Sequence, residues 1–435
     1  MTRKTGETRG HGSSSATAVR RFAASAAKLS STFALLFSLN AFAADEAQIE
    51  RGKYLATAAN CLTCHTRARG DAYAGGLAFN TDFGTIYSTN ITPDAATGIG
   101  NWSEEDFERA LRQGERPDGK HYYPAFPYTA FTGMSDDDVA DLYAYFMSIP
   151  AVSATPPEND LGFPYSQRWL LGMWKWRHFD EERFVPDDAK SAEWNRGAYL
   201  VENVAHCSAC HSPRTTLGAE DKDLAYTGGM YRDRVSSGDS RIVAWSAPNL
   251  TPASKGLEAW TEDDLSDYLK HGYTERAGVF GPMNKVIMNS TRHLEEADTR
   301  AMAVYLLNLP AQERGDGSNA DAETLRVGEL QYDIHCGTCH LPTGLGSRDT
   351  GPPLVGSPIT LAAEPEALIN MTLYGAEYPS TSPSDVWDES RHWDRMEAFG
   401  QKLSDERAAA LLTYIRSAWG NDASAVTEEQ VAAQR

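Results

Sequence analysis

The stretch CLTCH at residues 61–65 recurs twice, as CSACH at residues 207–211 and as CGTCH at residues 336–340. All six cysteines of the 435-residue chain fall in these three copies of Cys-x-x-Cys-His. This pattern is the attachment site of a c-type haem. The sequence therefore predicts three covalently bound haem c groups and, with them, a role in moving electrons.

The spacing of the motif has a physical reason. Side chains at i and i+3 lie on one face of a helical turn, so two thiols there can form thioethers to the two vinyl groups on one porphyrin edge. The adjacent histidine then reaches the iron with a ring nitrogen. We expect haem to be bound by Cys61, Cys64, Cys207, Cys210, Cys336 and Cys339, and iron by His65, His211 and His340.

Three other interpretations of the cysteines fit less well. A disulfide framework would not place a histidine after every pair, and a redox-active Cys-x-x-Cys motif needs one pair rather than three. A structural zinc site commonly takes two such pairs close in sequence, whereas these pairs lie 146 and 129 positions apart. Haem attachment accounts for the histidines as well as the cysteines.

Residues 1–43 are typical of a secretory signal peptide. Basic residues precede the apolar stretch STFALLFSL at residues 31–39, and Ala41-Phe42-Ala43 has the small-x-small pattern of a cleavage site. The apolar stretch is too short for a membrane anchor, which needs roughly 20 residues. Because c-type haems are attached outside the bacterial inner membrane, we expect export to its periplasmic side. No later segment is long and apolar enough to cross a bilayer, so membrane contact should be peripheral.

The charge of the chain restricts its partners. The formal charge is −20, and the first 43 residues hold six Lys or Arg and one Glu, so removing them makes it −25. Phosphates would be repelled, which argues against nucleic-acid binding. An acidic surface steers basic redox partners, although it also serves simply to keep a protein in solution.

The chain also repeats itself around the three motifs. A helical segment with a glycine near its start precedes each motif, at Gly52, Gly197 and Gly328. An Asn-x-Thr-Pro signature follows the first two motifs, at residues 90–93 and 249–252. Apolar residues at helical spacing predict a terminal helix in each unit, over residues 135–148, 295–308 and 404–417.

We therefore expect an all-α protein of three tandem cytochrome c-like domains, each with a covalently attached haem, over residues 45–150, 191–310 and 320–420. The linker over residues 151–190 is Pro-rich and then aromatic, which favours a helix packed on the neighbouring domain over a docking surface. The linker over 311–319 is polar and contains glycine, which predicts flexibility. Residues 421–435 form a polar tail.

The second axial ligand of each iron is expected to be a methionine in the loop before the terminal helix. Met283 and Met396 occupy that position in the second and third domains. The first domain has Phe126 there, so Met134 is its candidate, with His121 as a remote alternative. Met134 also aligns with the leucines that precede the other two terminal helices, which suggests a packing role.

The histidine ligands need support of their own. A ligating histidine usually donates its other N–H to a carbonyl or carboxylate, which fixes the ring. The stretch after the third motif, Pro352-Pro353-Leu354, is similar to the cytochrome c loop that supplies such a carbonyl. His206 and His335 stand next to first cysteines and are expected to be structural.

From about Ile49 to Trp419 the chain resembles the triple-haem cytochrome c subunit of bacterial membrane-associated dehydrogenases, such as those for alcohols, gluconate, aldehydes and sugars. The motifs that carry the resemblance are NITPD at residues 90–94, EWNRGAYL at 193–200, CHSPR at 210–214 and YIRSAWG at 414–420. The resemblance implies a non-catalytic role next to a separate catalytic chain that holds a flavin, pyrroloquinoline quinone or molybdenum cofactor. Electrons would then pass to ubiquinone or a terminal oxidase.

Two alternatives remain open at this point. One alternative is a peroxidase-like enzyme that uses an open first haem, because Phe126 stands where the methionine ligand is expected. A freely diffusing electron carrier is the other, although size and three domains argue against it. Substrate oxidation by the isolated chain would favour an enzyme, and co-purification with a dehydrogenase would exclude the free carrier.

Overall fold

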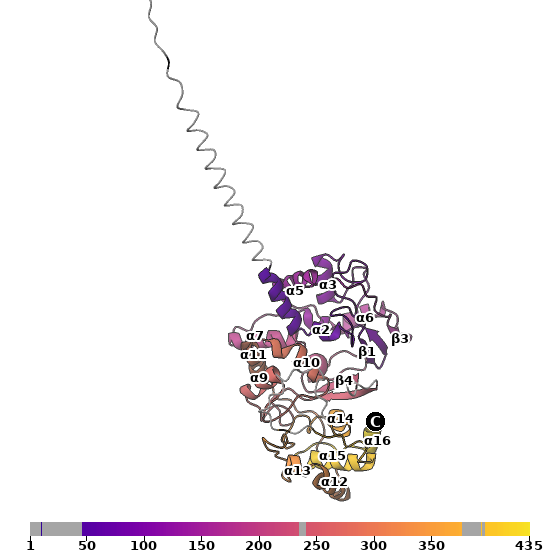
Figure 1. Ribbon diagram of the computed structural model, residues 1–435, viewed down its shortest axis with the longest axis vertical. Helices are drawn as coiled ribbons and strands as arrows, with labels where there is room; N and C mark the ends of the chain where they lie inside the picture. Colours follow the sequence, from indigo (N-terminus) through magenta and orange to yellow (C-terminus); the bar gives the residue numbers. More distant parts are fainter. Residues whose placement is uncertain (1–9, 11–45, 235–240, 376–392, 394–395) are drawn as a thin grey trace, which may run out of the picture.

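A computed structural model describes residue 10 and residues 46–234, 241–375, 393 and 396–435 (Figure 1). The expected signal peptide falls almost wholly outside the described residues and stays a prediction. In the described part of the chain, no helix is long and apolar enough to cross a membrane.

Three helix crossings organise the chain. In each unit, the helix before the motif packs on the terminal helix. The pairs are the helix over residues 46–58 with α5 (Asp136–Ser148), α7 (Ala192–Tyr199) with α11 (Glu296–Leu307), and α12 (Ala322–His335) with α15 (Asp405–Ser417). A glycine lies at each crossing because a Cβ there would strike the backbone of the terminal helix. That Cβ would lie 1.9 Å from Asp141 O at Gly52, 1.9 Å from Ala301 O at Gly197 and 2.2 Å from Ala410 O at Gly328.

The terminal helices begin and end where the sequence predicts. Ser135 and Ser404 are the N-caps of α5 and α15, and their hydroxyls accept the third backbone N–H of the helix. The residue before each N-cap is a fully packed apolar side chain. These residues are Met134, Leu294 and Leu403. Helix starts could be predicted because caps are local signals.

The motifs and the loops around them carry shorter helices. Each Cys-x-x-Cys-His lies on or beside a single turn, which is α2 (Cys61–Cys64), α8 (Ser208–His211) or α13 (Gly337–His340). The π-helix η1 (Leu200–Val204) leads from α7 toward the second motif. The other short elements are α3 (Glu104–Gln113), α4 (Tyr128–Phe131), α9 (Glu262–His271), α10 (Met283–Asn289), α14 (Glu366–Tyr374) and the 3-10 turns η2 (Lys222–Leu224) and η3 (Thr291–His293).

The prediction of an all-α fold is wrong in one respect, because two small antiparallel sheets stand among the helices. One contains β1 (Ala78–Thr81), β2 (Gly84–Tyr87) and β3 (Asp160–Leu161), and the other contains β4 (Gly229–Arg234) and β5 (Ile242–Ala247). In β5, Val243 and Trp245 are buried and cluster with Ala367 of α14. Strands this short, inside glycine-rich loops, give little periodic signal in the sequence.

The segments between the units are folded parts of the protein. The first linker contains α6 (Leu170–His178), the helix expected there, and the indole N–H of Trp174 donates to Leu217 O at 3.0 Å in the next unit. The second linker, expected to be flexible, is held by an ion pair between Arg314 and Glu364. The tail forms α16 (Glu428–Ala433), which packs on α15 with Val431 fully buried.

The first two units share one apolar core and exchange equivalent contacts. The hydroxyl of Tyr54 accepts the N–H of Glu295 at 3.0 Å and donates to Asp298 at 2.6 Å. In the reverse direction, the hydroxyl of Tyr199 accepts the N–H of Ser135 at 3.1 Å and donates to Asp138. Each tyrosine thus caps the terminal helix of the other unit, which fixes the two motifs relative to each other.

Candidate haem sites

The six cysteines lie two to a motif at short helical turns. All are unpaired, and each pair is spaced i, i+3 on or beside one helical turn. Burial raises the pKa of Cys61, Cys64, Cys207 and Cys336 to about 12. A redox-active thiol needs a lowered pKa in an electropositive setting. The raised pKa of these four thiols therefore argues against a redox-active pair.

The histidine of every motif is oriented by a backbone carbonyl. The distances from Nδ1 to the carbonyl oxygen are 2.7 Å from His65 to Thr89, 2.8 Å from His211 to Pro248 and 2.9 Å from His340 to Pro352. Burial lowers the pKa of all three rings, so they are neutral at neutral pH. With Nδ1–H donating to the carbonyl, Nε2 is left with a lone pair for a metal.

The Asn-x-Thr-Pro signature explains how that carbonyl is held in the second unit. Asn249 directly follows Pro248, and its side-chain oxygen accepts the N–H of Thr251 at 2.8 Å. Its amide donates to Gln312 O at 2.8 Å, beyond the end of α11. The side chain thereby ties the loop that orients His211 to the far end of the unit.

The other units use the same device. Asn90 follows Thr89, accepts the N–H of Thr92 at 2.9 Å and donates to Val152 O at 2.8 Å. In the third unit the asparagine follows the terminal helix α15 instead of standing in the loop that orients the histidine. There Asn421 reaches back to Leu354 O at 3.2 Å, two residues after the carbonyl that orients the histidine.

Replacing Asn249 with alanine is expected to loosen the loop that orients His211 without touching the ring itself. The change leaves Thr251 N–H buried without its partner and Gln312 O with only the 3.3 Å bond from the Thr251 hydroxyl, which should cost about 1–3 kcal/mol. Thermal unfolding measures that loss, and electron paramagnetic resonance shows whether the ligand field of the second haem broadens. Asn101→Ala, which removes an exposed amide bonded to Ala95 O, is the control. Equal unfolding temperatures for the two variants would contradict the assignment.

All three motifs contribute to one cavity of about 2050 Å³. This volume is about twice that of the largest pockets that typically bind a drug-sized ligand, so the cavity has room for more than one macrocycle. Its wall is predominantly apolar, as a porphyrin requires. Motif residues on the wall are Cys64, Cys207, Cys210, His211, Cys336, Cys339 and His340.

The structure brings two of the three candidate methionines to this cavity. Met283, the first residue of α10, lines it together with His211, and Met396 lines it together with His340. Met134 lies in the shared core instead and is fully buried. Phe126 packs against Tyr122 and Phe131.

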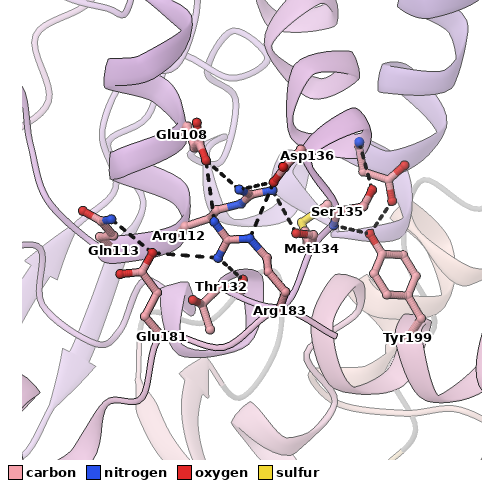
Figure 2. A network of polar contacts seen from close by, with 11 residues as sticks. Glu108, Arg112, Gln113, Thr132, Met134, Ser135, Asp136, Glu181, Arg183 and Tyr199 are labelled. Atoms are coloured by element: carbon pink, nitrogen blue, oxygen red, sulfur yellow. Dashed lines mark hydrogen bonds and ion pairs between the residues drawn. The ribbon is translucent and has the colours of Figure 1, made fainter. Parts of the chain in front are cut away.

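Figure 2 shows what holds Met134 in place. The buried guanidinium of Arg112 donates to Met134 O at 2.9 Å and pairs with Glu108 and Asp136, each at 2.6 Å. In the third unit, Arg435 donates to the carbonyl of the equivalent Leu403 at 2.7 Å. Met134 therefore occupies a position that leucine fills elsewhere, which is a packing position at the start of α5.

Sequence reasoning anticipated only one of the three orienting carbonyls, that of Pro352. It noted the Asn-x-Thr-Pro signatures without giving them a role, although the residue before each asparagine supplies the carbonyl. The reciprocal tyrosines were also missed. Their partners lie 244 and 61 positions away, so no local pattern marks them.

Comparisons with known proteins show the family of the chain. The family model described as "Cytochrome c" matches residues 49–150, and "Cytochrome C oxidase, cbb3-type, subunit III" matches residues 323–415. The chain is 38% identical to the alcohol dehydrogenase (quinone) cytochrome c subunit of Gluconobacter oxydans, with 87% of this chain and 80% of the relative covered.

Two further relatives extend the picture. The fructose dehydrogenase cytochrome subunit of Gluconobacter japonicus is 38% identical, with 88% of this chain and 82% of the relative covered. A nicotinate dehydrogenase subunit of Pseudomonas putida is 40% identical over 86% of this chain, and the match spans only 31% of that relative. This chain belongs to the family of cytochrome c subunits of bacterial dehydrogenase complexes.

Proposed function

We propose that the chain carries three covalently bound haem c groups and relays electrons from a dehydrogenase catalytic subunit to a respiratory acceptor. Electron transfer is the function of the family, and the number of haems, the partner and the acceptor are the specific parts of the proposal. When bound, haem c supplies one-electron chemistry at its iron. The protein contributes attachment, axial ligands, orientation and exclusion of water.

Each residue type at the sites has one role in this proposal. Cysteines of the three motifs hold the porphyrin edges, and the motif histidines ligate iron through Nε2. Met283 and Met396 are proposed as the second axial ligands in the second and third units, since both line the cavity beside the matching histidine. Met134 is the candidate in the first unit, where its core position gives it weaker support than the other two.

The observation that carries the relay is the convergence of the motifs on one cavity. Cysteines from all three motifs line the same wall, although the motifs lie 146 and 129 positions apart in sequence. Because electron tunnelling weakens steeply with distance, haem groups held by cysteines of one cavity would favour passage along the chain. The tyrosine exchange between the first two units fixes those units relative to each other.

The proposed partner is a dehydrogenase subunit with a flavin, pyrroloquinoline quinone or molybdenum cofactor, which oxidises a CH–OH or aldehyde donor. Support comes from relatives that are named for alcohol, fructose and nicotinate dehydrogenases. Ubiquinone or a terminal oxidase is the proposed acceptor. We place the protein on the periplasmic side of the inner membrane, peripherally bound.

Anaerobic mixing tests this proposal. The oxidised mature protein is combined with a dehydrogenase subunit that co-purifies with it and with that subunit's donor, and the haem absorption is followed. We expect full reduction of the haems only in the complete mixture, because in this proposal the catalytic subunit oxidises the donor. Reduction by the donor without the catalytic subunit would contradict a relay and favour an enzyme.

A further inference from the structure

The outer side of α6 presents large apolar side chains to solvent. Trp169, Met173 and Trp176 are 68%, 66% and 86% exposed, and Phe163 and Tyr165 before the helix are 86% and 46% exposed. These five residues are called the aromatic face. Contiguous exposed apolar patches on a soluble protein mark interaction sites.

The aromatic face is a fixed feature of the helix and not a product of loose packing. Positions 169, 173 and 176 are spaced i, i+4, i+7 and so lie along one side of α6. On the opposite side Leu171 is buried and Lys175 donates to Gln113 O at 2.5 Å. The ring of Tyr165 lies 4.5 Å from that of Phe83 at the turn between β1 and β2. The helix, which Figure 1 draws near that sheet, is therefore held with Trp169 facing solvent and with Met173 and Trp176 at the edge of the cavity.

The charge of this segment is opposite to that of the chain. Residues 161–179 contain Arg168, Lys175 and Arg177 and no Asp or Glu, in a protein whose formal charge is −20. Arg177 is exposed beside Trp176. Tryptophan and other large apolar side chains flanked by Lys or Arg are the composition of segments that lie in a membrane interface.

We propose that the aromatic face of α6 docks on the surface of an anionic lipid bilayer. An acidic protein is repelled by anionic headgroups over most of its surface, so a segment without carboxylates is where contact is favourable. Trp169, Trp176 and Phe163 would enter the headgroup region, and Arg177 would face lipid phosphates. Helix α6 would lie along the surface without spanning it.

The docking has a consequence for the cavity. Tyr165, Met173 and Trp176 of the aromatic face, and Arg177 beside it, also line the cavity that contains the motif cysteines, whereas Phe163 and Trp169 do not. A membrane bound through the aromatic face would place the edge of that cavity at the lipid surface, where a lipid-soluble quinone is available. This consequence rests on the proposed relay, and the lipid contact specifies the surface for the peripheral membrane binding proposed with it.

Vesicle co-sedimentation of the mature holoprotein tests the proposal. We use vesicles of phosphatidylethanolamine with phosphatidylglycerol, and of phosphatidylcholine alone. The test variant is Phe163→Ser/Trp169→Ser, because neither side chain lines the cavity. The control is Leu330→Ser/Leu345→Ser, which removes two leucines that are 52% and 59% exposed in the third unit.

We expect the wild type and the control to bind the anionic vesicles alike and the test variant to bind at least about tenfold more weakly, as for loss of a large apolar contact. Binding should be weaker on phosphatidylcholine. Equal binding of the test variant and wild type would overturn the proposal. So would a test variant that binds vesicles normally but no longer co-purifies with the dehydrogenase, because the face would then be a protein interface.

Reduction by the dehydrogenase in vesicle-free solution is measured on the same preparations. We expect it to be unchanged in the test variant. If the wild type fails to bind the anionic vesicles while its reduction by the dehydrogenase persists, the docking proposal is wrong and the relay stands. If reduction is absent in the wild type while lipid binding follows the pattern above, the relay is wrong and the docking proposal stands.

Discussion

Gly197→Ala is expected to lower the unfolding temperature sharply, because the added methyl would lie 1.9 Å from Ala301 O where α7 crosses α11. Neither helix backbone can move to accept the methyl group unless the two helices separate, which would open the core that the first two units share. Overpacking of this kind costs about 1–3 kcal/mol and more where only backbone atoms are in the way. Thermal unfolding of the holoprotein, followed by far-ultraviolet circular dichroism, measures the loss.

Gly162→Ala is the matched control for this substitution. A Cβ at Gly162 meets nothing within 4 Å. The control should therefore unfold at the wild-type temperature, while the equivalent changes at Gly52 and Gly328 should behave like Gly197→Ala. If Gly197→Ala unfolds at the same temperature as the control, close approach of the helices is not what the glycine provides.

Met283→Leu is expected to lower the reduction potential of one haem by an amount on the order of 0.1 V, within the roughly 0.8 V that axial ligands span. A thioether ligand raises the potential of a histidine-ligated haem, and leucine has nearly the same volume but no sulfur lone pair. Met396→Leu should shift a different haem by a comparable amount, since it lines the cavity with the third motif. A spectroelectrochemical titration resolves the two.

Met288→Leu provides the control within the same helix. Its sulfur lies 3.5 Å from an Arg292 nitrogen, and it is absent from the cavity wall. All haem potentials should stay at their wild-type values in this variant. Unchanged potentials in Met283→Leu as well would remove Met283 from the ligand set.

The sequence was informative wherever the determinant is local. The terminal helices follow from N-caps such as Ser135 and Ser404, and the aromatic linker forms the expected helix α6. The motif cysteines and histidines could be proposed as haem ligands because that chemistry requires fixed spacing. The structure adds the carbonyls that orient the histidine rings, and the role of these residues as ligands stays a prediction. The strands β4 and β5 could not, since their pairing depends on packing of Trp245 against α14, more than a hundred residues away.

Features that join distant segments were also beyond sequence reasoning. Asn249 was visible as part of a repeated signature, but its bond to Gln312 O spans 63 positions. The tail over residues 421–435 appears polar in sequence, yet Asn421 and Val426 are buried against the third unit. In each case a side chain that looks dispensable locally is fixed by a partner that only the fold supplies.

Haem stoichiometry of the mature protein tests the central claim most directly. The intact mass of the protein isolated from the periplasm is compared with its haem content by pyridine haemochrome absorption. We expect a mass that exceeds that of the processed polypeptide by three haem groups, with three haem c per chain. A mass equal to that of the bare polypeptide, or a content of two haems, would contradict it.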